Sequence, residues 1–547
     1  MTDRARASRQ QVTAQRSHWW VTTAGALTSL VLNLDQATVL LAAPTIAEAL
    51  GADLSATQWM FSGFLLPLAA LVMLGGGLTD RFGASFILRC GLALFIAGTV
   101  GSAFAGGMGL LIGLRAVSGM GAALAFPASV TLLRVHLPAG RPLNVALGLW
   151  FTGALGGSAI GPLIGGLLLR AWPWWSIFWL SCGFALAALV PVLIGVREEP
   201  APSATSELRV LPTLAGSVGL ALLIWGLISA GSAGWASGSV LWRMLGGLGV
   251  LALMTAAVRR GAGSRPDSGI DRRRLAGGLV IMLLAIVSVV GTMFFVITYL
   301  QSVLGFSPLV AGAAFMPFGV VAALISPFAM RLLERFGFGR MLVTAVLAEV
   351  AGLVLVSRIT PTSPYLLVGI ALALVGAAMS VFPAVSLHLA LSAAPSSRGG
   401  IVSGAHTVAI QLGQLLSIAT IGSLVASRVG GIHRSLLGDA GLDPDVPAGI
   451  TTDLALGRSA APPGVSAADG LLYEIAGYKA FTTAVGQAAL IVLAAVAVAA
   501  VAALAVLRPK GEPVGSPPPA ATRPGGDRRG ETGAPSPAVS GTEPSTP

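Results

Sequence analysis

Charge, cysteine and lysine are all scarce in this sequence. Only 10% of the 547 residues are charged and 55% are hydrophobic, whereas soluble domains carry about 25% charged residues. This composition excludes an ordinary soluble fold and indicates a polytopic membrane protein. The two cysteines, Cys90 and Cys182, lie in different apolar runs, so we expect neither a disulfide framework nor a paired-cysteine metal site.

Motifs for nucleotide hydrolysis and for common hydrolytic chemistry are also missing. The sequence has no GxxxxGK[ST] loop and no HExxH, paired CxxC or GxSxG motif. These absences argue against an enzyme and against ATP hydrolysis within the chain. The basic residues are nearly all arginine, and we attribute the net charge of +11 to cytoplasmic loops rather than to nucleic-acid binding.

Apolar runs are the dominant feature that is present. Each is close to the roughly 20 residues that an α-helix needs to cross a bilayer. The sequence therefore predicts an all-α polytopic membrane fold with 14 transmembrane helices, at about 19–43, 58–78, 86–106, 108–133, 144–170, 174–196, 210–231, 238–258, 275–300, 308–331, 340–358, 364–390, 401–427 and 481–507.

Arginine is concentrated in every second junction between these runs. The richest junction holds the cluster Arg259–Arg274, and the even-numbered junctions also hold Arg81, Arg89, Arg134, Arg141, Arg197, Arg209, Arg331, Arg335, Arg340 and Arg398. The odd-numbered short junctions hold few basic residues, chiefly Arg170 and Arg358. Because short loops rich in Lys and Arg stay on the cytoplasmic side, this alternation predicts that both termini are cytoplasmic.

The apolar runs and the polar stretches between them divide the chain into five predicted regions. In order they are a cytoplasmic N-terminal tail, an N-terminal six-helix bundle, a linker with two extra transmembrane helices, a C-terminal six-helix bundle and a disordered cytoplasmic tail. Their bounds are 1–18, 19–196, 197–274, 275–507 and 508–547. The C-terminal bundle includes a long external loop at about 428–480, and the last region is rich in Pro, Gly, Ser and Thr, so it cannot bury enough surface to fold.

A short internal repeat supports two equivalent bundles. Residues 78–83 and 332–337 share the pattern Leu-x-acid-Arg-Phe-Gly, and each follows the second predicted span of its bundle. Parallel repeats of six spans with a site at the midplane between them are a transporter architecture.

Asp35 lies near the middle of the first apolar run. A charge at the centre of a membrane helix costs about 2.5–3.5 kcal/mol on insertion scales, and such residues mark functional sites by default. The alternative is a structural carboxylate tied to a neighbouring helix.

Two more charged residues lie within predicted spans, Arg115 in LIGLRAVSGMG and Glu349 in LVTAVLAEVAGLVL. A buried arginine stays charged and needs an acceptor, so Arg115 either fixes helix packing through carbonyl groups or biases the protonation of a membrane carboxylate. We interpret Asp35, Arg115 and Glu349 as proton-coupling residues. Candidates for lining a substrate cavity are Asn33, Gln36, Trp59, Phe64, Gln411 and Gln414.

Glycine recurs at every fourth residue of the fifth run, from Gly153 to Gly165. A face of bare backbone allows close helix–helix approach, and Pro162 is expected to bend the helix. Simple packing explains this pattern in any case, and the functional interpretation adds a hinge or seal between the bundles. The motif comprises Gly153, Gly157, Gly161, Pro162, Gly165 and Gly166.

Taken in order, these motifs resemble the major facilitator superfamily, and within it the 14-span drug:proton antiporter group. The matching residues are Asp35 with Pro44, Trp59 with Phe64, Leu65 and Leu66, the loop from Gly76 to Gly83, Arg115 with Gly119 and Gly121, and the glycines of the fifth run. Ala84 and Ser85 replace two basic residues of the family's loop motif. The resemblance covers about residues 19–507, and it implies inner-gate loops formed by Gly76, Asp80, Arg81, Gly83, Glu334 and Arg335.

This resemblance implies proton-coupled efflux of hydrophobic or cationic drugs and toxic compounds by alternating access, with the proton as coupling ion and no other cofactor. It implies a multi-pass protein of the cytoplasmic (inner) membrane of a bacterium. We expect a monomer whose partners are a small-molecule substrate and the lipid bilayer, with no nucleic acid and no metal. The alternatives are a dedicated exporter of one endogenous metabolite or antibiotic and, further off, a non-transporting membrane receptor or scaffold.

Overall fold

The computed structural model describes residues 2–138, 140–196, 210–261, 271–393, 399–444, 450, 453–463 and 465–506. Over these residues the fold is all-α, without a β-strand. Several residues named above lie outside the described ranges, namely Arg197, Arg209, Arg265 and Arg398 of the junctions and the whole predicted tail 508–547.

The first half of the chain forms eight long helices. They are α1 (Thr2–Ala49), α2 (Leu54–Phe82), α3 (Ala84–Ala103), α4 (Met108–His136), α5 (Arg141–Ala171), α6 (Ser176–Gly195), α7 (Val210–Ala233) and α8 (Gly238–Gly261). The predicted N-terminal tail is part of α1, which runs without a break into the first span.

The second half begins with α9 (Arg272–Thr298), which continues as the π-helical turn η1 (Tyr299–Val303). The next span is interrupted and consists of α10 (Pro308–Ala314), α11 (Met316–Ile325), the short 3₁₀ turn η2 (Ser326–Phe328) and α12 (Ala329–Phe336). The remaining helices are α13 (Phe338–Ser357), α14 (Tyr365–Ser392), α15 (Gly399–Asp439) and α17 (Ala467–Val506).

Within the described residues, 13 helical segments are long and apolar enough to cross a membrane. The remaining predicted span corresponds to α8, whose described apolar stretch, Gly238–Met254, is shorter. The polytopic all-α fold predicted from the apolar runs is therefore confirmed.

Helices α1–α6, here called the N-set, pack in the same pattern as α9–α17, here called the C-set. In the N-set α1 packs against α5 and α6, α3 against α4 and α6, and α2 against α4. In the C-set α9 packs against α15 and α17, α13 against α14 and α17, and α11 against α14. A Cβ at Gly119 would lie 2.2 Å from the Phe64 carbonyl oxygen, and one at Gly376 would lie 2.3 Å from that of Phe318. The two sets therefore repeat one arrangement.

The repeated sequence motif forms the same turn in both sets. Gly83 and Gly337 have φ values of 89° and 80°, a region that favours glycine. Their amides donate to the carbonyl oxygens of Thr79 and Leu333 at 3.0 and 2.8 Å. The arginine two residues earlier lies 5.5 Å from the ring of the next phenylalanine in each turn.

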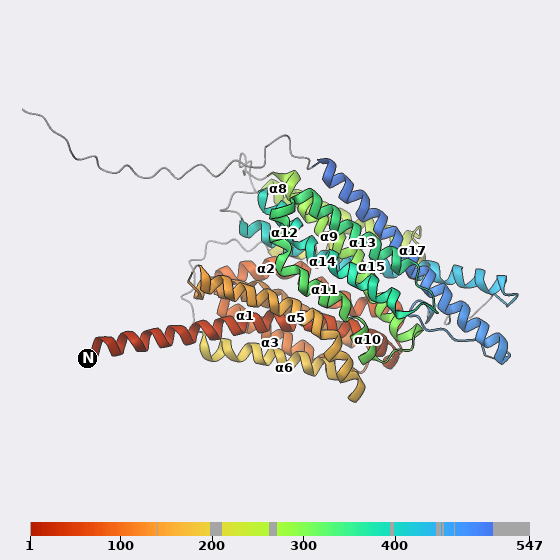
Figure 1. Cartoon of the computed structure of the whole chain (residues 1–547), viewed down its shortest axis with the longest axis horizontal. Helices are drawn as coiled ribbons and strands as arrows, with labels where there is room; N and C mark the ends of the chain where they lie inside the picture. Colours follow the sequence, from red (N-terminus) through yellow and green to blue (C-terminus); the bar gives the residue numbers. More distant parts are fainter. Residues whose placement is uncertain are drawn as a thin grey trace, which may run out of the picture. The chain divides into compact units, whose positions relative to one another are not determined.

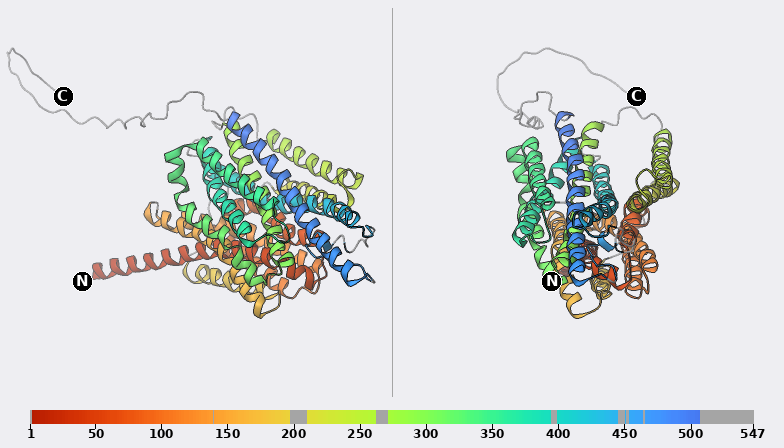
Figure 2. Two further views of the ribbon diagram at one scale, coloured as in Figure 1. Left: turned by 45° about the vertical axis from the view of Figure 1, so that its right-hand side comes forward. Right: turned by 90° about the vertical axis from the view of Figure 1, so that its right-hand side faces the viewer.

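Helices α7 and α8 form a hairpin at the periphery, which Figure 2 shows in yellow-green at one edge of the right-hand view. The Arg243 guanidinium of α8 lies 4.2 Å from the Trp225 ring of α7 and donates to the Ser229 hydroxyl at 3.2 Å. Helix α7 also contacts α2 and α15, so the hairpin attaches to both sets.

The segment expected as an external loop at 428–480 is largely helical. Helix α15 continues to Asp439 and α17 begins at Ala467, and Figure 1 shows both helices extending past the rest of the bundle at this end. Between these helices Leu454, Ala455 and Leu456 are buried. The expected loop is thus shorter than predicted, because alanine- and leucine-rich sequence keeps the helical conformation after the apolar run has ended.

Candidate functional site

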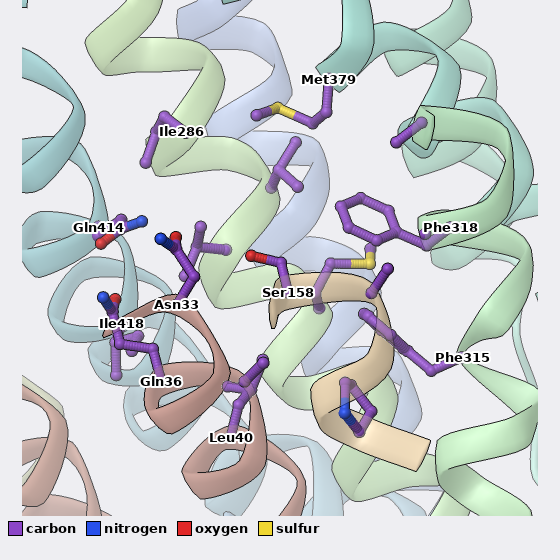
Figure 3. Close-up of a pocket in the computed structure, with 18 of the residues that line it drawn as sticks. Asn33, Gln36, Leu40, Ser158, Ile286, Phe315, Phe318, Met379, Gln414 and Ile418 are labelled. Carbon is purple, nitrogen blue, oxygen red and sulfur yellow. The ribbon is translucent and has the colours of Figure 1, made fainter. Parts of the chain in front are cut away.

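A cavity of about 340 Å³ lies between the N-set and the C-set. Its wall is built from α1, α2, α4 and α5 on one side and from α9, α11, α14 and α15 on the other. Figure 3 shows Asn33 and Gln36 of α1 near Gln414 of α15, with Phe315, between α10 and α11, and Phe318 of α11 across the cavity. The volume falls within the range of pockets for drug-sized ligands, about 300–1,000 Å³.

Contacts between the two sets gather at the end of the bundle where α1 ends and α2 begins. We call this the closed end. Figure 1 shows α10 beside the last turns of α5, and a Cβ at Gly166 would lie 2.5 Å from the Pro308 carbonyl oxygen. On the other side of the same end, Gln58 of α2 donates to the Ile418 carbonyl of α15 at 3.0 Å.

Two further contacts seal the closed end. Gln301 of η1 donates to the carbonyl of Leu41 at 2.8 Å. The rings of Phe61 and Phe294 meet edge to face at 5.6 Å. The buried segment Leu454–Leu456 packs into the same apolar cluster as these two phenylalanines, so the chain between α15 and α17 forms part of the seal.

Asp35 and Arg115 form a buried ion pair. The Arg115 Nη1 donates to Asp35 Oδ2 at 2.6 Å, and the two side chains are 1% and 0% exposed. The guanidinium also lies 4.4 Å from the Phe64 ring and 6.0 Å from the Phe178 ring. Sequence reasoning selected both charged residues without pairing them, and the structure identifies Asp35 as the carboxylate that Arg115 meets.

The ion pair is not fully satisfied by hydrogen bonds. Asp35 Oδ1 and Arg115 Nε have no partner among the described residues. Arg115 and Phe64 form part of the cavity wall, whereas Asp35 lies behind them. Removing one member of a buried pair typically costs about 3–5 kcal/mol because the other charge stays buried.

Glu349 is buried in the C-set, away from the cavity. Its carboxyl shares a hydrogen bond with the Ser288 hydroxyl of α9, and the Ser288 oxygen also lies 2.9 Å from the Ala285 carbonyl oxygen. Glu349 Oε2 has no partner in the described part of the chain, so the bond to the Ser288 hydroxyl is the one hydrogen bond of this carboxyl among the described residues.

We expect Glu349→Gln to retain the activity of the protein within about twofold of wild type, because glutamine keeps the size of the side chain and a hydrogen bond to Ser288. Glu349→Leu, which leaves the Ser288 hydroxyl without this partner, should lower the melting temperature of the purified protein more than Glu349→Gln does. A loss of activity in a stable Glu349→Gln protein would instead show that the ionisable group of Glu349 has a functional role beyond packing.

Four of the six candidates for the cavity line it, and two do not. Asn33, Gln36, Phe64 and Gln414 are in the wall. Trp59 instead packs half-buried against the apolar cluster of the N-set. Gln411 is only 5% exposed and lies outside the cavity lining. Neither residue lines this cavity in the present conformation, because a polar or aromatic residue in a span can also face a helix interface.

The glycine face of α5 packs against α1, as its spacing predicts. A Cβ at Gly153, Gly157 or Gly161 would lie 2.5 Å from the Ala26 oxygen, 2.4 Å from the Leu30 oxygen and 2.7 Å from the Ala37 Cβ, respectively. Gly165 faces Thr38. Pro162 and Gly166 meet the C-set instead, at Gly312 and Pro308 of α10, so two adjacent faces of α5 serve packing within the N-set and closure between the sets.

The two repeated turns lie at the end opposite the closed end, here called the far end. Helices α2 and α10 start at the closed end, so the turns that follow α2 and α12 lie far from it. Asp80, Arg81, Glu334 and Arg335 are exposed there, and Gly76 is half-buried. Gly83 ends α2 and begins α3.

Sequence reasoning missed most of the apolar cavity wall. Phe315, Phe318, Met282, Met293 and Met379 line it, together with the small residue Ser158 of α5. Apolar residues of a membrane helix look alike in sequence whether they face lipid, a helix or a cavity. One sequence feature did indicate this part of the wall. Prolines interrupt the span after the Ser307 cap, the second of them in MPFG at residues 316–319, and interrupted spans are typical of transporter binding sites.

Comparison with known proteins adds the family. A model described as Major Facilitator Superfamily matches residues 25–418. The chain belongs to the Major Facilitator Superfamily. This superfamily consists of membrane transporters, so the chain is a multi-pass membrane transporter and not an enzyme.

Two curated superfamily relatives cover most of the chain. A tetracenomycin C resistance and export protein of Streptomyces glaucescens is 32% identical over 430 residues, which are 78% of this chain and 79% of that protein. The multidrug efflux pump LfrA of Mycolicibacterium smegmatis is 27% identical over 441 residues, 78% of this chain and 82% of the relative.

Solved transporter structures share the superfamily fold. A bacterial homologue of the human lysosomal transporter Spinster has a TM-score of 0.57 and 16% identity, and the match covers 90% of this chain and 97% of that chain. The POT family transporter PepTSo has a TM-score of 0.59 and 15% identity over 90% of this chain and 98% of the other. These likenesses show the fold alone.

Proposed function

We propose that this chain is a proton-driven exporter of hydrophobic drugs and other toxic compounds that works by alternating access. The observation that supports this most directly is the cavity between two equivalent helix sets, with the buried Asp35–Arg115 pair at its wall. The relatives named as resistance and export proteins support the direction of transport. One copy of the chain contains the whole cavity, so we propose a monomer.

We propose that the far end faces the cytoplasm of a bacterium and that both termini lie on that side. The far end carries the arginine-rich turns at Arg81 and Arg335, and Lys/Arg-rich loops stay cytoplasmic. Since the sets meet at the closed end, the conformation is then the one that receives substrate from the cytoplasm.

The coupling step that we propose is the protonation of Asp35. An ionised Asp35 pairs with Arg115, whereas a protonated Asp35 gives up most of this attraction and releases the guanidinium toward the cavity wall. Arg115 and Phe64, which stand between Asp35 and the cavity, would then rearrange. The proton is the only coupling ion in this scheme, with no other cofactor.

The available driving force sets an upper limit on efflux. One charge crossing 100 mV is worth about 2.3 kcal/mol, and one pH unit about 1.4 kcal/mol. Together these terms hold a gradient of roughly several hundred-fold for a neutral substrate per proton, since 1.4 kcal/mol is about tenfold.

Everted membrane vesicles test the proposed function. Their cytoplasmic face points outward, so an acidic interior should drive the uptake of a hydrophobic fluorescent drug. We expect uptake to stop when the pH gradient is reversed or an uncoupler is added, because the substrate exchanges against protons. Vesicles without the protein are the control. Binding of drugs without any proton-dependent uptake would favour a receptor or scaffold.

A further inference from the structure

The cavity wall presents no free charge. Among its described lining residues, Arg115 is the one charged side chain, and it is 1% exposed and already paired with Asp35 at 2.6 Å. Asp35 and Glu349, the acids within the spans, both lie outside the lining. A cation that leaves water needs a counter-charge to offset its lost hydration, and this wall offers none.

Three amide side chains on one side of the cavity carry most of its hydrogen-bonding groups, and the two lining hydroxyls, Ser158 and Ser326, each donate to a carbonyl of their own helical segment. The Asn33 Nδ2 donates to the Ser29 carbonyl at 2.9 Å and the Gln36 Nε2 to the Leu32 carbonyl at 3.2 Å. The Gln414 Oε1 has no partner among the described residues. An amide has two N–H donors and an oxygen acceptor, so all three keep capacity for a ligand that both donates and accepts.

The opposite side of the cavity suits flat aromatic rings. Figure 3 shows Phe315, Phe318 and Met379 across the cavity from the amides, and the two phenylalanine rings lie 5.3 Å apart at an angle of 41°. Met282 and Met293 of α9 also line the cavity. Phenylalanine rings and thioether sulfurs both make favourable contacts with aromatic ligands, and methionine adapts to ligands of different outline.

We propose that the substrates are neutral or weakly acidic molecules of fused aromatic rings, with hydroxyl and carbonyl groups along one edge. The oxygen-bearing edge meets Asn33, Gln36 and Gln414, and the ring faces pack against Phe315, Phe318 and the methionines. Permanent cations are poor substrates of the wild-type protein. This inference rests on the proposed function and selects one substrate class within it.

Paired probes test the substrate class in everted vesicles. One probe is a dihydroxyanthraquinone, which is neutral and carries hydroxyl and carbonyl groups on fused rings. The other is ethidium, a permanent cation with a fused aromatic system. We expect pH-driven uptake of the anthraquinone at a rate at least about tenfold above that of ethidium, the factor that 1.4 kcal/mol of preference gives.

A single charge change should reverse this preference. Gln414→Glu places a carboxylate in the wall at the site of a neutral amide of nearly the same shape, and we expect ethidium uptake to rise and anthraquinone uptake to fall. The matched control is Gln487→Glu on α17, outside the cavity, where the Arg428 guanidinium already donates to the side-chain oxygen at 3.1 Å. This control should keep the wild-type preference.

The outcomes separate the inference from the function on which it rests. Uptake of ethidium but not of the anthraquinone by the wild-type protein overturns the inference and leaves drug efflux intact. An unchanged preference in a folded, active Gln414→Glu protein also overturns it, since the amide would then not face the ligand. If the vesicles take up neither probe and no other hydrophobic drug, the result counts against the proposed function itself.

Discussion

We expect Asp35→Asn to abolish the proposed proton-driven efflux and to reduce the rate at least about 100-fold, which corresponds to 2.8 kcal/mol or more. Asparagine cannot carry a proton between the two sides, although it can still accept a hydrogen bond from the Arg115 guanidinium, which lies 2.6 Å from the carboxylate in the wild-type protein. Membrane insertion should therefore persist. Uptake into everted vesicles under an imposed pH gradient measures the effect.

Substrate counterflow distinguishes lost coupling from lost folding. Counterflow exchanges labelled for unlabelled substrate without a proton gradient, and Asp35 lies outside the cavity lining, so the variant should retain it. The matched control is Asp271→Asn, the same chemical change at a side chain that is 49% exposed and caps α9. Asp271→Asn should transport normally.

A double variant separates the ion pair's structural role from its coupling role. Asp35→Asn leaves the positive charge of Arg115 buried without its counter-ion, at a typical cost of about 3–5 kcal/mol. Asp35→Asn/Arg115→Gln removes both charges, so it should recover thermal stability relative to the single variant without recovering proton-driven uptake. Wild-type pH-driven uptake by either variant would remove Asp35 from the mechanism.

The sequence made the charged residues visible but not their partners. Asp35 and Arg115 stand out because each interrupts an apolar run, and that is a local property of the chain. Their pairing depends on how α1 and α4 are rotated against each other, and the two residues are separated by 80 positions. The glycine face of α5 was also predictable from a local property, because regularly spaced glycines indicate a closely packed neighbouring helix. The spacing alone does not identify that neighbour as α1.

The cavity was only partly predictable. Asn33, Gln36 and Gln414 are polar in apolar surroundings, so sequence reasoning could select them, but Gln411 is polar too and, like Trp59, is not part of the lining of this cavity. Phe315 and Met379 gave no signal, because lipid and a drug cavity favour the same side chains. The extension of α15 to Asp439 and the early start of α17 at Ala467 were not predicted. The fall in hydropathy at these positions was interpreted as the end of the helix, whereas the helix continues beyond the apolar run.

Gly166→Leu stops transport because the closed end can no longer form. Even a Cβ at this position would lie 2.5 Å from the Pro308 carbonyl oxygen and 2.6 Å from the Leu309 Cα, and these backbone atoms belong to the other helix set. Overpacking a close contact costs about 1–3 kcal/mol or more, which shifts the balance between the two conformations by roughly 5- to 150-fold. The opposite conformation does not need this contact, so it should accumulate.

Labelling of a single cysteine reports this shift. Ser158→Cys, in a background with Cys90 and Cys182 replaced, puts a thiol in the cavity wall. When this protein keeps Gly166, a membrane-impermeant thiol reagent should reach the new thiol from the far end. When it also carries Gly166→Leu, the reagent should reach the thiol from the closed end. The matched control is Gly156→Leu on the same helix, where a Cβ would meet no atom within 4 Å. If Gly166→Leu transports at the wild-type rate with unchanged labelling, the contact between α5 and α10 is not the gate, and closure must depend instead on α2 and α15.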